Sequence, residues 1–361
     1  MLEPTKLLDI ARVFAGMLTD SSLGKKTDLP FLKQLLPSSP SATDQDNVQV
    51  LVIGGSVCRT AKVEQASKGF SFPRYRECSQ PAFATKEDFL QFVLSKILSD
   101  TTLVTINFAF PLTPVLRRNK TDGILIFGTK EHAFSGLVGE AVGEEIENYL
   151  ASHLKRNVSV VLANDAICLL LAGVTKAPWD RLACGIVGTG VNFAITNGDT
   201  EAVNLESANF TDFLHSETLA AVDKKSREPG RALFEKETAG AYLYQHYNEI
   251  VRQKNPSLSR LTSTRELKEI VLRDLPGVEI AKELLGRSAG LVASQMAGIM
   301  FFKKTGVSFL MEGGFFWEDT LYADLVKKYL ARMGLPYKAS IFKLPESSLL
   351  GAAVLAFFPI G

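Results

Sequence analysis

The sequence predicts an α/β protein with two related halves around a cleft. Apolar strands are followed by a glycine turn at three places, and segments with apolar residues at helical spacing lie between them. The three strand-and-turn units are 48-VQVLVIGGSVCRTAKVE-64, 182-LACGIVGTGVNFAITNG-198 and 307-VSFLMEGGFF-316. Recurrence of one unit along a chain is a sign of internal repetition. The 361 residues are enough for one large or two medium domains.

The composition is that of an ordinary globular protein. Apolar residues make up 46% of the chain, charged residues 22%, and the formal net charge is +1, so nothing global indicates a nucleic acid or a membrane as partner. The N-terminus lacks the pattern of a signal peptide, and no apolar run is long enough to span a membrane. The four cysteines lie far apart with no CxxC pair, which favours a reducing cytoplasm over a disulfide scaffold or a metal cluster.

In chain order, the first element is an amphipathic helix over residues 1–20, followed by a linker rich in Ser, Pro and Asp at residues 36–47. Residues 48–64 predict a strand, a Gly-Gly turn and a second strand. Residues 86–99 predict a helix because their apolar residues recur at helical spacing.

The middle of the chain predicts two further strands and two helices. The apolar runs 102–112 and 123–130 predict a strand pair around a basic loop, RRNKTDG. Residues 136–155 have the apolar spacing of a helix. The run 158–163 predicts a strand, and a helix begins at about Asp165.

The second half begins with strand, glycine turn and strand over residues 182–198, with a hairpin signal at Asn197-Gly198. Helices are predicted to dominate from 228 to about 303. The strand-and-turn unit at 307–316 follows, and residues 345–358 predict a buried helix that contains glycine.

Asn164 and Asp165 lie between two apolar runs, at a predicted strand-to-helix junction. One interpretation is a helix N-cap, because Asn and Asp accept the free amides of a first helical turn. Another is a carboxylate at the mouth of the cleft, kept ionised by the helix N-terminus and able to accept a proton from a substrate hydroxyl. The two interpretations are compatible.

The glycine turns also allow two interpretations. Glycine lets backbone amides approach phosphate oxygens, and Ser or Thr adds a hydroxyl donor, but any one of these turns taken alone is more often a plain hairpin. The dinucleotide-binding fingerprint is absent, because Phe193 stands where Gly or Ala is required and a strand follows. The candidate phosphate-binding residues are Gly54, Gly55, Ser56, Gly188, Thr189, Gly190, Gly313 and Gly314.

Thr129 and Lys130 end an apolar strand, and Glu206 and Glu235 follow later in polar segments. Taken one at a time, such residues are usually solvated surface groups. The four histidines have no metal-ligand spacing, so the residues alone assign no metal site.

Taken together and in order, these segments resemble the hexokinase family of sugar kinases. The match with the longest motif is 223-DKKSREPGRALFEKETAGAYL-243, similar to the family's D-x-x-S-x-N-P-G-x-Q-x-F-E-K-x-x-x-G-x-Y-L pattern. The other matches are FAFP (108–111), TK (129–130), ND (164–165), GIVGTGVN (185–192), NLE (204–206) and SSLLGAA (347–353). The resemblance extends from about residue 48 to residue 358.

The resemblance implies a two-lobed actin-like (ribonuclease H-like) sugar kinase fold of the α/β class, with an interlobe cleft for sugar and ATP. The implied division is an N-terminal helix and linker (1–47), a small lobe (48–165 plus 346–361) and a large lobe (166–345). The implied activity is ATP-dependent, Mg²⁺-assisted phosphorylation of a hexose, glucose above all, at its 6-hydroxyl.

The resemblance also implies roles for single residues. Asp165 would be the general base on the sugar hydroxyl. The residues implied to hydrogen-bond the sugar are Thr129, Lys130, Asn164, Asn192, Glu206 and Glu235. Beside the glycine-turn residues already named, Arg59 and Ser347 would contribute to the ATP site. Such a site suits the chemistry, because phosphoryl transfer needs positioning, a base and phosphate donors rather than covalent catalysis.

The chain departs from the family pattern mainly on the phosphate side. The family's first phosphate loop reads D-x-G-G-T-N-x-R, whereas the chain has 52-VIGGSVCR-59, so Val52 and Val57 replace the Asp and the Asn. Ala109 replaces the Ser of FSFP, Glu206 lacks the Trp-Gly that follows it in the family, and Glu312 precedes Gly313 where the family has Asp.

Three functions therefore follow as hypotheses. The first is an active ATP-dependent hexokinase. The second, motivated by Val52, is a catalytically impaired sugar-binding sensor or regulator of the same fold. The third is an actin-like scaffold protein that keeps the lobes and binds no sugar. The sequence leaves the preferred hexose, the way Mg²⁺ is held and the oligomeric state open.

Overall fold

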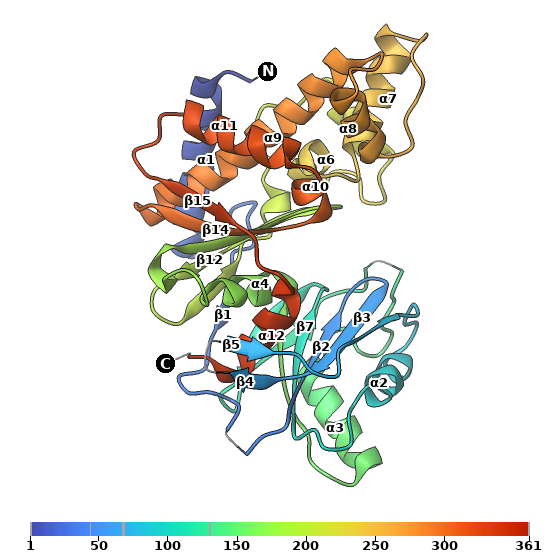
Figure 1. The fold of residues 1–361 in the computed structure, drawn as a ribbon, viewed down its shortest axis with the longest axis vertical. Coiled ribbons are helices and arrows are strands. Elements are labelled where there is room, and N and C mark those ends of the chain that lie inside the picture. Colours follow the sequence, from blue (N-terminus) through green and yellow to red (C-terminus); the bar gives the residue numbers. More distant parts are fainter. Residues whose placement is uncertain (1, 44, 67–68, 130, 360–361) are drawn as a thin grey trace. The chain divides into compact units, whose positions relative to one another are not determined.

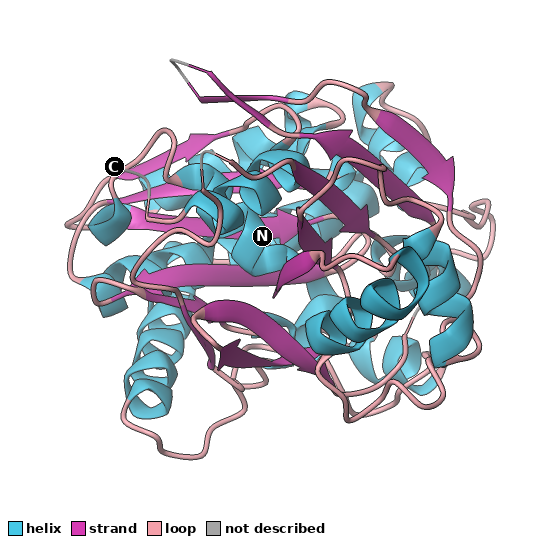
Figure 2. Ribbon diagram, turned by 90° about the horizontal axis from the view of Figure 1, so that it is seen from below, coloured by secondary structure: helices cyan, strands magenta, loops and turns pink. Residues whose placement is uncertain are grey.

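The computed structural model describes residues 2–43, 45–66, 69–129 and 131–359. Figure 2 shows helices and strands interleaved, as the α/β expectation requires. The chain divides into two compact units by its internal contacts. Unit 1 comprises Met1–Phe31, Ala183–Phe193 and Leu205–Lys343; unit 2 comprises Leu32–Leu182, Ala194–Asn204 and Leu344–Gly361. The predicted lobes have other limits: residues 166–182 and 194–204, predicted in the large lobe, belong to unit 2, and the predicted N-terminal segment is divided between the units after Phe31.

Unit 2 is built on a five-stranded sheet of order β10-β7-β2-β3-β6. The strands are β10 (Ser159–Asn164), β7 (Leu103–Phe108), β2 (Val48–Ile53), β3 (Val57–Lys62) and β6 (Arg76–Ser79). β10, β7 and β2 are parallel, whereas β3 and β6 are antiparallel to their neighbours. Every residue of β2 and β7 is buried, which is why these strands are nearly continuous apolar runs in the sequence.

The two faces of this sheet pack against different helices. Alternate residues such as Ile106 and Phe108 enter one apolar core with residues of α2 (Lys86–Leu94) and α3 (Val142–Leu154). The residues between them face the other side of the sheet. There Thr105 donates to the carbonyl of Ala352 and Asn107 to that of Ser348, both on α12 (Ser347–Phe357). The predicted buried C-terminal helix is thereby confirmed. It also packs along α4 (Asp165–Gly173).

The predicted strand pair at 102–112 and 123–130 is wrong. β7 pairs with β2 and β10 instead, and the basic loop is the middle of a separate hairpin of β8 (Leu112–Arg117) and β9 (Lys120–Leu125). Only two residues form its turn, both with positive φ. The basic side chains belong to strands because acidic groups neutralise them. Arg117 pairs with Asp122 and Glu147, and Lys120 pairs with Glu147.

Two helices are shorter than predicted. The helix expected over 86–99 ends at Leu94, and the one expected over 136–155 begins only at Val142. The second start is set by Asp122, whose carboxylate accepts hydrogen bonds from the amides of Gly143 and Glu144 at 2.7 and 3.0 Å. This cap comes from a neighbouring strand in space, so no local capping signal marks it.

A six-stranded sheet has the order β1-β13-β12-β11-β14-β15. Its strands are β1 (Leu32–Leu35), β13 (Glu201–Asn204), β12 (Val191–Asn197), β11 (Leu182–Val187), β14 (Val307–Glu312) and β15 (Ala339–Phe342). The predicted strand–turn–strand at 182–198 corresponds to β11 and β12, and the predicted hairpin at Asn197-Gly198 joins β12 to β13.

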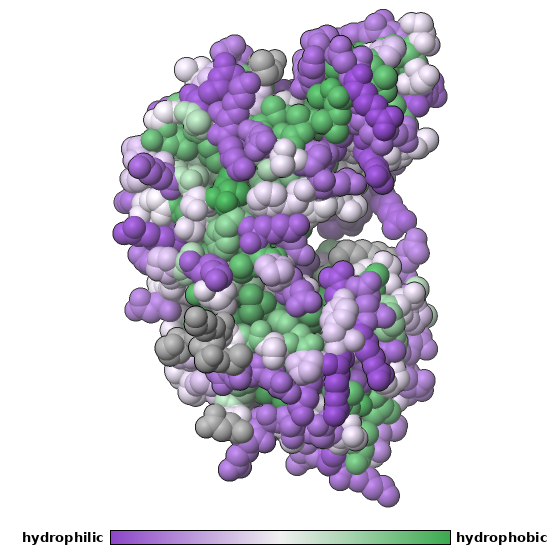
Figure 3. Space-filling model, viewed as in Figure 1, coloured by the Kyte–Doolittle hydropathy of each residue, from purple (hydrophilic) through white to green (hydrophobic). Residues whose placement is uncertain are grey.

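The helical core of unit 1 is formed by α1 (Pro4–Ser22), α9 (Val278–Lys303) and α11 (Thr320–Arg332), which lie side by side in Figure 1. Helix α9 is buried along most of its length. A Cβ at Gly298 would lie 2.8 Å from the carbonyl oxygen of Ala11, so glycine permits the close approach of α1. Hydrophilic residues are spread over the face of each unit seen in Figure 3. Among the described residues, no helix has the length and apolar character of a membrane span.

The remaining elements are short or belong to the α-helical part of unit 1. They are β4 (Glu64–Ala66), β5 (Gly69–Ser71), η1 (Trp179–Arg181), η2 (Ser207–Asn209), α5 (Leu219–Lys224), α6 (Leu233–Thr238), α7 (Leu243–Lys254), α8 (Thr264–Leu272) and α10 (Gly314–Trp317).

Candidate functional site

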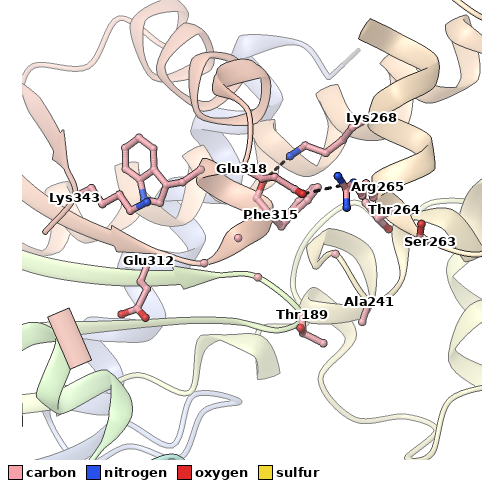
Figure 4. A pocket seen from close by; sticks show the side chains of 15 residues that line it. Thr189, Ala241, Ser263, Thr264, Arg265, Lys268, Glu312, Phe315, Glu318 and Lys343 are labelled. Atoms are coloured by element: carbon pink, nitrogen blue, oxygen red, sulfur yellow. Dashed lines mark hydrogen bonds and ion pairs between the residues drawn. The ribbon is translucent and has the colours of Figure 1, made fainter. Parts of the chain in front are cut away.

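A pocket of about 780 Å³ opens in unit 1 (Figure 4). It is formed by the β11–β12 turn, the start of α8, the end of β14 with α10, and one residue that follows β15. The lining residues are Gly188, Thr189, Gly240, Ala241, Ser263, Thr264, Arg265, Lys268, Glu312, Gly313, Gly314, Phe315, Trp317, Glu318 and Lys343. The two predicted glycine turns of unit 1 therefore meet at one pocket. A Cβ at Gly188 would lie 3.6 Å from the Cα of Gly313.

The turn between β11 and β12 directs its carbonyl groups into the protein. The amide of Gly240 donates to the carbonyl of Gly188 at 2.8 Å, that of Ala241 to Thr189 at 3.3 Å, and that of Gly188 to Gly190 at 2.9 Å. Among the described residues, the amides of Thr189 and Gly190 have no hydrogen-bond partner. Successive amides form a concave anion-binding site where the turn directs them to the same side.

Glu235 packs directly on this turn. Its Oε2 accepts a hydrogen bond from the amide of Val191 at 3.1 Å, and it would lie 2.5 Å from a Cβ at Gly190. Glycine at position 190 thus permits the close approach of this carboxylate. Glu235 lies in the first turn of α6.

The segment before α6 is fixed by a buried ion pair. Lys236, 3% exposed, donates to Asp223 at 2.5 Å and to the carbonyl of Glu228 at 2.6 Å. Burial of Asp223 opposes its ionisation, but the hydrogen bonds from Lys236 and from the amide of Gly230 outweigh this effect and lower the pKa of the carboxyl. The segment that presents Glu235 is therefore held at both ends.

Helix α8 begins at the wall of the pocket. Ser263 is its N-cap and accepts the amide of Glu266 at 3.4 Å, so the helix dipole and the first-turn amides favour negative charge there. The lining cations are Arg265, Lys268 and Lys343, against the anions Glu312 and Glu318. Figure 4 shows Arg265 reaching toward Glu318, with 3.7 Å between Nε and Oε1.

Lys268 is an interior residue of the pocket wall, with 2% of its side chain exposed. Its Nζ lies 2.7 Å from Asp319 Oδ2, donates to the carbonyl of Phe315 at 3.1 Å, and lies 5.2 Å from the centre of the Phe315 ring. These contacts join α8 to α10, so both walls of the pocket depend on one lysine.

In unit 2, Asp165 is the first residue of α4 and directly follows β10, as predicted. Its carboxylate is near enough to Cys168 to act on that thiol electrostatically: burial raises the pKa of Cys168, and the charge of Asp165 raises it further. Ionised Asp165 is favoured by the helix N-terminus at which it stands.

Asn164 is the N-cap of α4, which confirms the capping interpretation. Its Oδ1 accepts the amide of Ala166 at 3.0 Å and Nδ2 of Asn204 at 3.2 Å, while its Nδ2 donates to the carbonyl of Phe110 at 3.3 Å. An amide side chain offers two acceptor and two donor positions. In these bonds Asn164 uses both acceptor positions and one donor position, so one N–H is left for a ligand.

The remaining predicted residues are distributed over both units. In unit 2, Thr129 lies in the loop after β9, Lys130 is outside the described residues, Arg59 pairs with Glu77 at 2.8 Å, and Ser347 begins α12. In unit 1, Asn192 Oδ1 accepts the amides of Phe193 and Ser207 at 2.8 and 3.1 Å, and Glu206 has φ of 48° before η2. Arg59 and Ser347 are not lining residues of the unit 1 pocket.

Sequence reasoning missed most of the wall of this pocket. Ser263 and Thr264 carried a usable signal, since Ser263 with Glu266 three residues later is the pattern of a capping box. Lys268, Phe315 and Lys343 had none, because nothing in the local sequence distinguishes them from other lysines and core aromatic residues.

The chain is similar in sequence and in fold to known proteins. No family model matches the sequence. Hexokinase-9 of Oryza sativa subsp. japonica is 26% identical over 264 residues, which cover 63% of this chain and 51% of the rice protein. A hexokinase of Schistosoma mansoni is 24% identical over 260 residues, covering 64% of this chain and 57% of its own length. The chain thus spans little more than half the length of these curated relatives.

Among solved structures, the S. mansoni hexokinase complexed with glucose matches with a TM-score of 0.78 at 18% identity, over 98% of this chain and 95% of that one. A ROK-family glucokinase from Streptomyces griseus, in complex with glucose and AMPPNP, matches with a TM-score of 0.59 at 15% identity, over 86% and 99%.

The chain is similar in sequence to hexokinases over about two thirds of its length, and its fold matches solved hexokinase structures over 98% of the chain. Its fold is the two-lobed, actin-like sugar kinase fold that the resemblance implied. The glycine turn at residues 188–190 and the carboxylate at the start of α4 are present where the resemblance implies them, whereas Val52 stands at the position for which the resemblance implies an aspartate.

Proposed function

We propose that the protein phosphorylates a hexose at its 6-hydroxyl with ATP as the phosphoryl donor, and that glucose is the preferred hexose. The observation that carries the proposal is the position of Asp165, a carboxylate at the end of a buried parallel strand and the start of a helix, in a chain of hexokinase fold and ancestry. The printed description of the S. mansoni structure, a complex with glucose, supports the choice of hexose.

Asp165 would act as the general base. Its carboxylate accepts the proton of the 6-hydroxyl while that oxygen forms a bond to the γ-phosphorus, and the bond between this phosphorus and the β–γ bridging oxygen breaks to release ADP. A base positioned in this way contributes about 10²–10⁴-fold to the rate. The positive end of the α4 dipole would favour the charged form of this carboxylate.

The sugar hydroxyls would be bound by Glu235, Glu206, Asn192 and Thr129, with Lys130 and the remaining N–H of Asn164. Carboxylate and amide groups suit this task because a neutral polyol offers only hydroxyl donors and acceptors. Glu235 is the strongest candidate of this set, since its carboxylate is already oriented by the Val191 amide.

ATP would occupy the pocket of unit 1. The available amides of Thr189 and Gly190 and the start of α8 favour phosphate groups, and Phe315 and Trp317 offer apolar surface for a nucleoside. A pocket of about 780 Å³ is within the range of small-molecule sites. Gly54, Gly55, Ser56 and Arg59 are further candidates for phosphate contacts, and Ser347 is a candidate for a contact with the adenosine.

The described residues include no group of three His, Cys, Asp or Glu side chains placed to hold a metal ion. One hard oxygen is nevertheless available next to the substituted position: Asn107 Oδ1 is buried without a partner in the described chain, on the strand residue in register with Val52. Mg²⁺ usually keeps several waters and binds through one or two protein oxygens and the substrate phosphates. Asp165 and Asn107 fit that limited role, in which the ion would screen the phosphate charge.

The proposal is tested by glucose-dependent formation of ADP by the purified full chain, measured in a coupled assay with ATP and Mg²⁺. We expect turnover with glucose and none when glucose is omitted. Absence of turnover across a panel of hexoses would refute it.

A second function is favoured by Val52, which is 8% exposed and leaves the hairpin of β2 and β3 without the family's carboxylate. It is a sensor or regulator that binds hexose without efficient turnover. Calorimetry with glucose decides between the two: binding without ADP formation supports the sensor, and binding with ADP formation supports the kinase.

A further inference from the structure

The turn at Gly54–Ser56 in unit 2 has all of its carbonyl groups occupied by the protein's own donors. Gln80 Nε2 donates to the carbonyl of Gly54 at 2.7 Å, and the amide of Gln80 donates to that of Ser56 at 2.8 Å. The ring Nε2 of His132 lies 2.8 Å from the carbonyl oxygen of Gly55. No partner exists among the described residues for the amides of Gly55 and Ser56.

The protonation of His132 follows from its two contacts. The amide of Phe83 donates to His132 Nδ1 at 3.0 Å, so Nδ1 is the acceptor nitrogen. In the neutral ring the proton is therefore on Nε2, which donates to Gly55. The ring is 4% exposed and stacks on Phe134 with 15° between the planes, so its orientation is fixed by packing.

The hydrogen bond from Gln80 to Gly54 leaves the other polar atom of the Gln80 side chain without a partner in the described part of the chain. The side chain is 8% exposed, and its Oε1 is buried without a partner in the described part of the chain. A buried acceptor without a partner destabilises the folded state. Only the donor end of the amide is used, which indicates that the residue serves the Gly54 carbonyl rather than stability.

Unit 1 contains the same arrangement in a different form. The carbonyls of Gly188 and Thr189 are held by backbone amides of Gly240 and Ala241, and again the turn's own amides have no partner among the described residues. Two turns built from different donors therefore share one result: the carbonyls are bound internally and the amides are available to an anion.

We propose that His132 and Gln80 are positioning residues that hold the Gly54–Ser56 turn with its amides available to a phosphate group. This inference rests on the proposed function, in which that phosphate belongs to ATP. By this device the turn binds phosphate through its backbone although Val52 and Val57 supply neither a carboxylate nor an amide side chain. His132 takes no direct part in the reaction. It acts only through the carbonyl of Gly55.

The test uses two substitutions that each keep one half of the histidine. His132→Asn retains an acceptor at the position of Nδ1 for Phe83 and loses the donor to Gly55. His132→Gln retains a donor at the position of Nε2 and loses the acceptor. Binding of AMPPNP to the full chain, with glucose and Mg²⁺ present, is measured by calorimetry, and folding is checked by thermal unfolding.

We expect AMPPNP to bind about tenfold more weakly to H132N and within about threefold of the wild type to H132Q, because one hydrogen bond near 1.4 kcal/mol corresponds to a factor of ten. Equal losses, no loss, or a larger loss in H132Q would overturn the inference, since a residue needed only for packing would not separate the two variants. A wild-type chain that binds no AMPPNP would refute the proposed function and this inference together.

Gln80→Met provides an independent check should either histidine variant fail to fold. Methionine has a side chain of similar size. It lacks both the Nε2 donor to Gly54 and the Oε1 acceptor that has no partner in the described part of the chain. We expect the midpoint of unfolding to be unchanged or raised while AMPPNP affinity falls about tenfold. Unchanged affinity would overturn the positioning role of Gln80. A fall in stability together with affinity would show a structural role instead.

Discussion

The carboxylate of Glu235 accepts a hydrogen bond from the amide of Val191, with 3.1 Å between Oε2 and nitrogen. This bond joins the start of α6 to the first residue of β12, immediately after the glycine turn. A residue proposed to bind the sugar is thus oriented by the same turn that is proposed to bind phosphate. The bond requires the space above Gly190 to be empty.

Substitution of Gly190 by alanine should therefore disturb the sugar side. Its Cβ would lie 2.5 Å from Glu235 Oε2, so the carboxylate must move and lose the Val191 amide. We expect the KM for glucose to rise by about tenfold, the effect of one charge-assisted hydrogen bond. Gly16→Ala is the matched control, since a Cβ there meets nothing within 4 Å. A normal KM in G190A would argue against Glu235 as a sugar ligand.

The ion pair of Lys268 and Asp319 should be necessary for the pocket of unit 1. In Lys268→Met the partly buried carboxylate of Asp319 loses its partner at 2.7 Å, and we expect unfolding to require about 3 kcal/mol less. The double variant with Asp319→Asn should recover much of this loss, because a neutral pair removes the uncompensated charge. Urea denaturation of both variants measures the difference. Equal stability of the single and double variants would contradict this account.

His246 should make stability fall with mild acid. Burial lowers its pKa below the ordinary value of 6.5, and its ring contacts Thr218 at 2.7 Å and the carbonyl of Lys236 at 2.8 Å. Because the unfolded chain binds the proton more readily, the stability present above pH 6.5 is lost as pH falls from 6.5 through the lowered pKa. Glu237, Glu249 and Arg287 also act on this ring.

The measurement is the free energy of unfolding in urea at several pH values between about 7.5 and 5, for the wild type and for His246→Gln. The variant lacks the titrating ring, so we expect its stability to fall less over this range, whatever its value at pH 7.5. Parallel curves for the two proteins would assign the acid sensitivity to other groups.

Val52→Asp distinguishes the two proposed functions. The kinase account expects the wild type to turn over already, and expects the aspartate to destabilise the sheet by about 1–3 kcal/mol because the position is 8% exposed between Asn107 and Arg59 in register. The sensor account expects turnover only in V52D. Val52→Asn, equal in size and uncharged, controls for the loss of the apolar side chain.

Much of the fold was predictable from local sequence because its main strands are buried on both faces. β2, β7 and β10 were expected from continuous apolar runs, and the N-cap at Asn164 from the residue type alone. Contacts between distant segments were not predictable in this way. Asp122 fixes the start of α3 from another strand, and paired acids convert the basic loop into β8 and β9.

The candidate site divides in the same manner. Short motifs identified both glycine turns of the unit 1 pocket, because glycine marks close backbone approach. The residues that hold the Gly54–Ser56 turn of unit 2 in place carry no such mark: Gln80 lies 24 residues beyond Ser56 and His132 far later in the chain. Their role depends on single hydrogen bonds that only the folded arrangement reveals.

The central claim is that Asp165 is the base for phosphoryl transfer to a hexose. The most direct measurement follows glucose 6-phosphate formation from ATP and glucose by ³¹P NMR, beside calorimetric glucose binding, for the wild type and Asp165→Asn. The account predicts that the wild type forms the product, and that D165N binds glucose within about threefold while turning over about 10²–10⁴-fold more slowly. Asp199→Asn, at an exposed position, is the control and should turn over like the wild type. Turnover by D165N at the wild-type rate would contradict the account.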